Sequence, residues 1–140
     1  MSRVQLALNV SDLDAAVDFY SKLFDTPPAK LRPGYANFAI AEPPLKLVLI
    51  EREGRGASLN HLGVEVSSPE DVKVATDRLA GEGLPTLIQD GVDCCYALQD
   101  KVWVTDPDGA RWEVYTVLSD SLSETGALNA SKKEGASTCC

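Results

Sequence analysis

The chain has 140 residues, of which 44% are hydrophobic and 24% charged, the balance of an ordinary globular protein of one domain. Thirteen basic residues against 21 acidic ones leave a formal net charge of −8, which argues against nucleic acid or an anionic membrane as partner because both require a basic face. No apolar run approaches the roughly 18 residues of a transmembrane helix, and the N-terminal residues lack the apolar core of a signal peptide, so we expect a cytoplasmic protein.

The two halves of the chain carry the same pattern. An offset of 56 residues aligns Gln5 with His61 and, without a gap, the residues that follow each of them. Each copy opens with a strand of alternating apolar residues, over 4–10 and 62–66. A helix-capping signal and an amphipathic helix follow in both copies. The sequence therefore predicts an internal repeat.

Short strands follow each predicted helix. In the first copy they cover 35–40 and 45–51, and in the second 101–105 and 111–117, around the turn sequence Asp-Pro-Asp-Gly at 106–109. Nine extra residues separate helix and hairpin in the second copy, near 90–100. We predict that they form a loop insertion, the kind of segment on which function is commonly carried.

These elements define the expected fold class, α+β. We predict two tandem β-α-β-β-β modules, about 3–53 and 58–118, that form a curved mixed sheet around a metal-binding cleft in one domain over 1–118. Residues 119–140 are small, polar and aperiodic, and we expect a disordered tail that ends in Cys139 and Cys140. One chain suffices to complete such a cleft, so a monomer is expected and a homodimer is the alternative.

The paired modules resemble the vicinal oxygen chelate superfamily. The resemblance rests on Gln5 and His61 on matching first strands and on the turn at 106–109 followed by Trp112-Glu113-Val114-Tyr115. Members of the superfamily include glyoxalase I, extradiol dioxygenases and fosfomycin-resistance thiol transferases. The added segment with Cys94-Cys95 is most similar to the carbon–arsenic lyase branch, iron-dependent dioxygenases that demethylate trivalent methylarsenicals. A cadmium-induced protein group is similar to the same branch.

The resemblance implies a metal site at Gln5, His61 and Glu113. Strand parity agrees, because Gln5 and His61 both lie opposite the helix-facing residues of their strands. Val48 holds the fourth pseudo-symmetric position and cannot be a ligand. An imidazole, a carboxylate and an amide oxygen suit Fe²⁺ and leave coordination positions for O₂ or substrate. The ligand types alone do not exclude Ni²⁺, Co²⁺ or Zn²⁺.

Cys94 and Cys95 are the candidate arsenic ligands. Neighbouring cysteines cannot staple distant loops, and two thiols side by side suit a soft electrophile. A methyl- or aryl-As(III) has one position held by carbon and two left for sulfur, which matches the pair. The alternatives are small hydrophobic residues or a redox pair. Tyr96, Lys101 and Trp103 are candidate pocket residues, and for Tyr115 we favour packing over catalysis.

The sequence thus predicts an Fe²⁺-dependent dioxygenase that uses O₂ as co-substrate to cleave the carbon–arsenic bond of small trivalent organoarsenicals and release arsenite. Two alternatives compete. One is a protein that sequesters Cd²⁺ or another soft ion through its thiols without turnover. The other is a glyoxalase-like metal-dependent isomerase, against which the missing carboxylate at Val48 counts.

Overall fold

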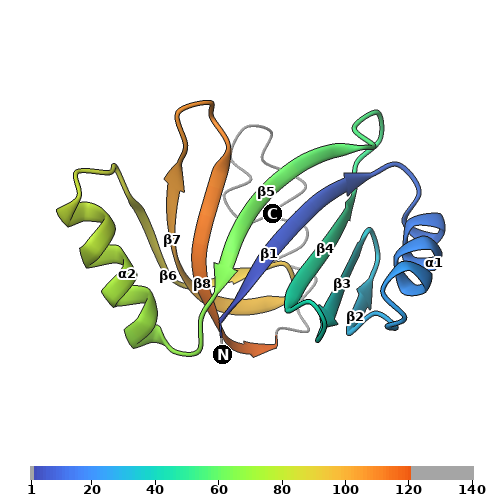
Figure 1. Ribbon diagram of the computed structural model, residues 1–140, viewed down its shortest axis with the longest axis horizontal. Helices are drawn as coiled ribbons and strands as arrows, with labels where there is room; N and C mark the ends of the chain where they lie inside the picture. The colour runs from blue at the N-terminus through green and yellow to red at the C-terminus, as the bar shows by residue number, and fades with distance from the viewer. Residues whose placement is uncertain (1, 121–140) are drawn as a thin grey trace. The chain divides into compact units, whose positions relative to one another are not determined.

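The computed structural model describes residues 2–120, and their element order repeats one motif (Figure 1). Both modules run strand, helix and three strands, which confirms the predicted α+β class with two β-α-β-β-β modules in tandem. The first consists of β1 (Arg3–Val10), α1 (Leu13–Leu23), β2 (Lys30–Arg32), β3 (Tyr35–Ile40) and β4 (Leu45–Glu51). The second consists of β5 (Ser58–Glu65), α2 (Pro69–Gly81), β6 (Leu87–Cys94), β7 (Ala97–Thr105) and β8 (Arg111–Asp120).

The chain divides into two compact units, one of them Arg3–Leu62. In this unit β1 runs parallel to β4, while β3 is antiparallel to both β4 and β2, so the sheet is mixed. Helix α1 packs on β3 and β4 (Figure 1). Asp12 accepts a hydrogen bond from the backbone N–H of Ala15 at 3.1 Å and starts the helix, as its capping signal predicts.

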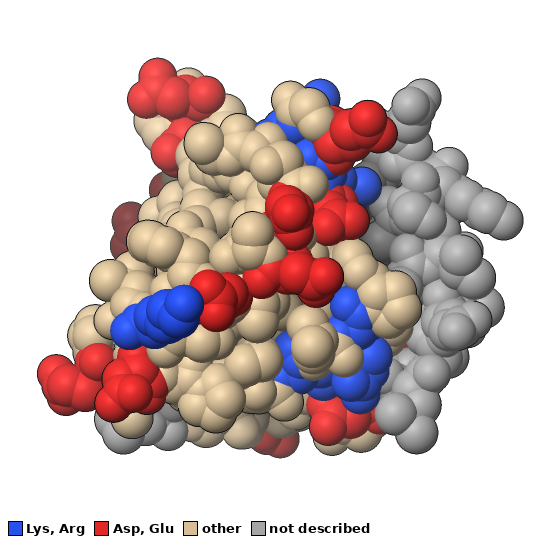
Figure 2. Space-filling model, turned by 90° about the vertical axis from the view of Figure 1, so that its right-hand side faces the viewer, with Lys and Arg blue, Asp and Glu red and all other residues tan. Residues whose placement is uncertain are grey.

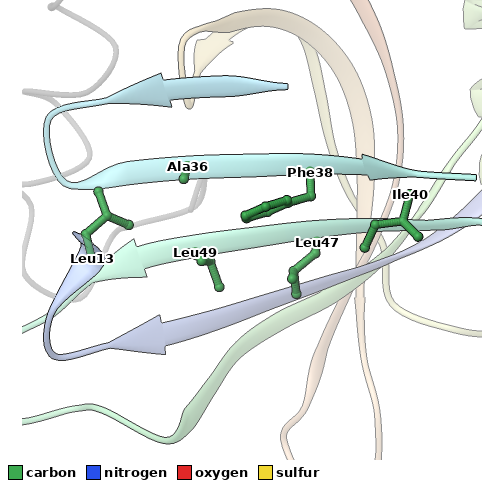
Figure 3. Packing of buried hydrophobic residues seen from close by; sticks show 6 residues of the cluster. All are labelled: Leu13, Ala36, Phe38, Ile40, Leu47 and Leu49. Carbon is green, nitrogen blue, oxygen red and sulfur yellow. The ribbon is translucent and has the colours of Figure 1, made fainter. Parts of the chain in front are cut away.

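The apolar core of this unit lies between α1 and the sheet. Figure 3 shows Phe38 on β3 beside Leu47 and Leu49 on β4, with Leu13 of α1 at one end. Leu6, Leu8 and Val10 of β1 pack against the same cluster, which confirms that these residues face the helix. The residues between them on β1 are therefore directed to the opposite side of the sheet.

Within the described residues the other unit comprises Ser2 and residues 63–120. Its strands β6, β7 and β8 form an antiparallel sheet, and α2 packs on β7 and β8. Ser68 caps α2 by accepting from the backbone N–H of Asp71 at 3.2 Å, and the helix ends at Gly81, as predicted. The predicted turn at 106–109 is closed by Asp106 Oδ1, which accepts from the backbone N–H groups of Asp108 and Ala110.

The predicted loop insertion near residues 90–100 is wrong. The segment near 90–100 is not a loop insertion but the two-stranded hairpin β6–β7, with Cys94 paired opposite Ala97. Strand β6 escaped prediction because its residues are mostly exposed, in no regular alternation, and a register shift interrupts it between Gln89 and Val92. The short strand β2 was missed because three residues carry too little periodicity. Strand β8 continues to Asp120.

The chemistry of the surface agrees with the charge of the chain. On the face that Figure 2 shows, acidic and uncharged side chains interrupt the basic ones. Neither of the two helices in residues 2–120 combines the length and apolar character needed to cross a bilayer. The tail predicted over 119–140, with Cys139 and Cys140, lies outside the described residues beyond position 120.

Replacing Phe38 by alanine should lower the free energy of unfolding by about 3–5 kcal/mol, because its ring is fully buried in the core. The matched control is Phe19→Ala, since Phe19 is 57% exposed on α1; it should change stability by less than about 0.5 kcal/mol. Urea unfolding followed by circular dichroism measures both. Equal losses for the two variants would contradict the assigned core.

Candidate metal and thiol site

Gln5 and His61, the residues aligned by the repeat, lie side by side. Gln5 is 4% and His61 2% exposed. Gln5 Nε2 and His61 Nε2 are 3.2 Å apart, within hydrogen-bond distance. The strands position them: Gln5 sits on β1 opposite the face that packs on the core cluster, and His61 sits on the first part of β5. The contact gives each of these buried polar side chains a hydrogen-bond partner, as buried polar groups require.

The other ring nitrogen of His61 also has a defined neighbour. His61 Nδ1 lies 2.7 Å from Oδ1 of Asn60, the preceding residue. An amide oxygen can only accept, so Nδ1 carries a proton, and in the neutral ring Nε2 then keeps its lone pair. That is the form in which an imidazole binds a metal through Nε2. Gln5 places its amide nitrogen beside Nε2, and the imidazole nitrogen together with the amide oxygen of Gln5, once turned, would fit a borderline divalent cation.

Glu113, the third candidate ligand, is 2% exposed on β8 and forms a buried ion pair. Its Oε2 lies 2.8 Å from Nζ of Lys101 on β7, and both side chains are almost entirely inaccessible. A buried carboxylate requires a compensating cation. Lys101 supplies one here, and a bound metal ion would satisfy the same requirement.

Lys101 also reaches the cysteine pair. Its Nζ is 3.8 Å from Sγ of Cys94, within the range of a hydrogen bond to sulfur. The ammonium lies 5.4 Å from the centroid of the Trp103 ring and 5.9 Å from that of Tyr115, at cation–π distance. The β7–β8 register brings this set together, because Lys101 is opposite Tyr115 and Trp103 is opposite Glu113. Lys101 thus links the candidate arsenic ligand to a candidate metal ligand.

Tyr115 makes one further polar contact. Its hydroxyl group donates to Oε2 of Glu65 at 3.0 Å, although the side chain is only 1% exposed. The ring fills space beside Lys101 and the hydroxyl group is satisfied within the same unit. This geometry suits packing and orientation.

Cys94 and Cys95 stand at the turn of the β6–β7 hairpin. Cys95 and Tyr96 both have positive φ, 51° and 61°, the conformation of a two-residue turn that usually contains asparagine and glycine. Residues other than glycine adopt positive φ only at a cost in energy. Cys94 is fully buried and Tyr96 6% exposed, so packing of the neighbours holds the turn in place.

The oxidation state of the pair differs from the expected one. We predicted two thiols, whereas Cys94 and Cys95 are both disulfide-bonded, and the described residues include no free cysteine. Thiolates are the species that bind soft metals and arsenic. Any such binding by this pair therefore requires prior reduction.

Gln99 on β7 is a residue that sequence reasoning missed. Its Nε2 donates to the backbone carbonyl of Cys94 at 3.0 Å and supports the turn. Its Oε1 is buried, and within residues 2–120 it has no hydrogen-bond partner. Buried acceptors are normally paired, so this oxygen is available to a donor on a bound molecule.

The described structure brings the candidates together in two groups. Gln5 and His61 meet in the unit Arg3–Leu62, while Glu113 and the cysteine pair belong to the other unit with Lys101. Across residues 2–120, no cluster of three or more His, Cys, Asp and Glu side chains is arranged to hold a metal ion. A hollow of about 880 Å³ over Asn9, Phe19 and Ser58 does not include Gln5 or His61.

Comparison with known proteins defines the class. Residues 3–114 match the model of the Glyoxalase/Bleomycin resistance protein/Dioxygenase superfamily. The match covers most of the chain and both modules. The chain therefore belongs to this superfamily, as the paired modules and the residues of the repeat indicated.

The chain is similar to curated relatives of two kinds. The cadmium-induced protein CadI of Mycobacterium tuberculosis is 60% identical over 142 residues, which cover 100% of this chain and 93% of that protein. A trivalent organoarsenical cleaving enzyme of Thermomonospora curvata is 63% identical over 122 residues, covering 86% of this chain and 81% of that enzyme. A second enzyme of that name, from a Bacillus species, is 38% identical over 146 residues, with 99% and 91% covered.

Solved structures agree on the fold. Methylmalonyl-CoA epimerase from Mycobacterium tuberculosis has a TM-score of 0.59 at 16% identity, with 88% of this chain and 89% of that chain covered. An extradiol ring-cleaving dioxygenase from B. fuscum has a TM-score of 0.61 at 20% identity, with 91% and 35% covered. At these identities the likeness concerns the fold alone.

Replacing Lys101 by methionine should lower the free energy of unfolding of the metal-free protein by about 3–5 kcal/mol, because Glu113 then keeps a buried charge without a partner. Lys73→Met is the matched control. Lys73 forms an exposed ion pair with Asp77 on α2 at 2.9 Å, and loss of this pair should cost less than about 0.5 kcal/mol. Thermal and urea unfolding measure the difference. A Lys101 variant as stable as the control would contradict the assigned charge compensation.

Proposed function

We propose that this protein is an Fe²⁺-dependent dioxygenase that cleaves the carbon–arsenic bond of trivalent organoarsenicals and releases arsenite. The observation that carries the proposal is the buried cluster in which Lys101 contacts both Cys94 and Glu113. The sulfur of Cys94 suits arsenic and the carboxylate of Glu113 suits a metal ion, and both lie within reach of the same ammonium group. The names of the relatives from Thermomonospora curvata and Bacillus support the same substrate class.

Cys94 and Cys95 would bind the substrate after reduction. Methylarsenite has two exchangeable positions on arsenic, and two adjacent thiolates replace both of them. The third position stays with carbon, which is thereby held in one orientation relative to the hairpin. The strained turn at Cys95 and Tyr96 favours this role, since it keeps the two sulfurs on neighbouring residues at a fixed end of β6.

Gln5, His61 and Glu113 would hold the metal through an amide oxygen, Nε2 and a carboxylate. For this the Gln5 amide would turn its oxygen to the side on which its Nε2 now faces His61. When bound, Fe²⁺ supplies a site where O₂ can be activated, and open coordination positions remain because Val48 contributes no ligand. An amide is a weaker ligand than imidazole, so we expect loose binding. Ni²⁺, Co²⁺ or Zn²⁺ could take the same donors without supporting the oxidation.

Lys101 has two tasks in this proposal. Without metal it compensates the charge of Glu113 at 2.8 Å. When Glu113 becomes a metal ligand, the ammonium is left with the sulfur of Cys94, at 3.8 Å, and favours its thiolate form electrostatically. The side chain then orients the sulfur that holds arsenic. Positioning of carbon against oxygen is the chief contribution of the protein.

The proposed reaction balances in atoms and electrons. Methylarsenite and one O₂ give arsenite and formaldehyde: the carbon–arsenic bond breaks, arsenic gains a third hydroxyl group, and carbon leaves in oxidised form. No external reductant is consumed in the cleavage. Reductant is needed only to keep Cys94 and Cys95 as thiols.

Sequestration of a soft metal ion is the second candidate. It is favoured by the 60% identity to the cadmium-induced protein CadI and by the cysteine pair, which would bind Cd²⁺ without any need for O₂. A glyoxalase-like isomerase uses a metal ion and a carboxylate base, and Val48 leaves the fourth position without one. The isomerase also leaves the cysteine pair without a role.

The two candidates separate in one experiment. Reduced full-length protein is loaded anaerobically with Fe²⁺, mixed with methylarsenite, and then exposed to O₂, with arsenic speciation as the readout. Arsenite and formaldehyde in equal amounts are expected. Stoichiometric retention of methylarsenite without arsenite release, in air and with iron, would refute the dioxygenase and favour sequestration.

Metal and arsenic ligands should fail independently. His61→Ala or Glu113→Ala should abolish arsenite release yet leave methylarsenite binding by the cysteines largely intact. Cys94→Ser or Cys95→Ser should lose binding and turnover together and keep Fe²⁺ binding. The parent should carry serine at Cys139 and Cys140, so that tail sulfurs cannot replace the pair. Full activity of His61→Ala, or of Cys94→Ser in this parent, would refute the corresponding assignment.

The valence of arsenic predicts selectivity. Two thiolates satisfy methylarsenite completely but leave inorganic arsenite one sulfur short, so the reduced protein should bind the organoarsenical at least about tenfold more tightly, a difference of about 1.4 kcal/mol. Weaker binding of arsenite would also let the product leave. Equilibrium dialysis of the parent lacking Cys139 and Cys140 measures both affinities. Tighter binding of arsenite would show that a third sulfur takes part.

A further inference from the structure

A chain of hydrogen bonds connects the backbone to the ring of His61. It runs from the carbonyl of Arg55 through Ser58, Asn9 and Asn60, all within the unit Arg3–Leu62. Its four links measure 2.5 Å, 2.9 Å, 2.9 Å and 2.7 Å in that order. Ser58 and Asn60 belong to β5 and Asn9 to β1, so the chain crosses between two strands.

The direction of every link follows from the first one. The Ser58 hydroxyl oxygen is 2.5 Å from the Arg55 carbonyl oxygen, and two oxygens approach so closely only with a proton between them. A carbonyl group cannot donate, so the single hydroxyl proton of Ser58 lies on this contact. Ser58 Oγ can then only accept in its contact with Asn9.

The same reasoning passes along the two amides. The Asn9 atom that faces Ser58 must be Nδ2, which leaves Asn9 Oδ1 to accept from Asn60 Nδ2 at 2.9 Å. Asn60 therefore turns its Oδ1 to the ring, 2.7 Å from His61 Nδ1. An acceptor at this distance requires a proton on Nδ1. One backbone carbonyl thus determines which ring nitrogen carries the proton.

The contact on the far side of the ring agrees independently. Gln5 Nε2 lies 3.2 Å from His61 Nε2. An amide nitrogen can only donate, so His61 Nε2 accepts and bears the lone pair. Both neighbours of the imidazole therefore favour the same tautomer, whereas an unconstrained neutral imidazole side chain in water favours the proton on Nε2.

We propose that Ser58, Asn9 and Asn60 are positioning residues that hold His61 in its Nδ1–H form and present the Nε2 lone pair for metal binding. The metal part of this inference rests on the proposed function, while the tautomer part concerns the metal-free protein. Partners of this kind fix the ring of a metal-binding histidine, and their loss weakens metal affinity about 10- to 100-fold. Pre-setting the tautomer matters here because the neighbouring ligand, an amide, is weak.

His61 is the only histidine of the chain, so a single set of ring signals reports on it. The metal-free, ¹⁵N-histidine-labelled full-length protein is studied at alkaline pH by two-bond ¹H–¹⁵N correlation, which distinguishes the two tautomers. The parent should show the Nδ1–H form. Asn60→Leu and the milder Ser58→Ala, which frees both amides to flip, should shift the ring towards Nε2–H.

Two controls accompany these variants. Asn60→Asp keeps an oxygen facing Nδ1 and should retain the Nδ1–H form. If Asn60→Leu shifted the tautomer only through lost side-chain packing, Asn60→Asp would shift it as well. Ser11→Ala changes an exposed serine outside the chain of hydrogen bonds and should leave the ring signals unchanged. An Nε2–H parent, or an Asn60→Leu protein that keeps Nδ1–H, would overturn the proposal.

Titration with Co²⁺ tests the metal part. Asn60→Leu should bind Co²⁺ about 10- to 100-fold more weakly than the parent, with Asn60→Asp close to the parent. Unchanged Co²⁺ affinity after the tautomer has shifted would overturn the positioning role. If the parent itself binds no Co²⁺ while the tautomers shift as expected, the hydrogen-bond chain stands and the proposed metal site fails.

Discussion

The burial of polar side chains inside β-strands is the constraint on which the rest of this structure depends. Gln5, His61 and Glu113 are each at most 4% exposed, and groups of this kind lose more from desolvation than they gain unless every one is paired. Apolar residues at these positions would give a more stable sheet. Their presence is therefore an argument for function, and the partners they require explain much of the polar architecture around them.

The two units meet this requirement in different ways. Around His61 the partners are neutral. The hydrogen bonds through Asn60 and Asn9 end at the backbone carbonyl of Arg55, which can only accept. Around Glu113 the partner is a cation, Lys101, which a second cation can replace. The first arrangement fixes the position of a lone pair on His61, and the second compensates the charge of Glu113. In the metal-free protein each of the two proposed ligands thus has a partner that a metal ion would have to replace, the Gln5 amide N–H at His61 and the ammonium of Lys101 at Glu113.

The proposed chemistry separates hard from soft ligands. Nitrogen and oxygen donors on β1, β5 and β8 suit a first-row divalent metal, whereas the sulfurs at the β6–β7 turn suit arsenic or cadmium. Lys101 is the side chain in contact with both kinds of ligand. Because the sulfurs are disulfide-bonded here, the redox state of the surroundings decides whether the soft site is available. This holds for cleavage and for sequestration alike.

Features that depend on local periodicity or on a short capping signal could be predicted from the sequence. They are the repeat, the two helices with their caps, the β-α-β-β-β order and the side of the strand on which Gln5 and His61 lie. Strand β6 could not, since its pattern is irregular and a register shift interrupts it. The sequence indicates Lys101 only as a candidate pocket residue and does not predict its ion pair with Glu113. It gives no sign of the roles of Asn60 and Gln99, because an asparagine or a glutamine on a strand is typical of a solvated residue. Only the pairing of β7 with β8 makes Lys101 the counter-ion of Glu113, and only the approach of β1 to β5 makes Asn60 orient His61. Residue types and spacing depend on the chain alone, whereas the partner of a buried polar group depends on which strands lie next to each other.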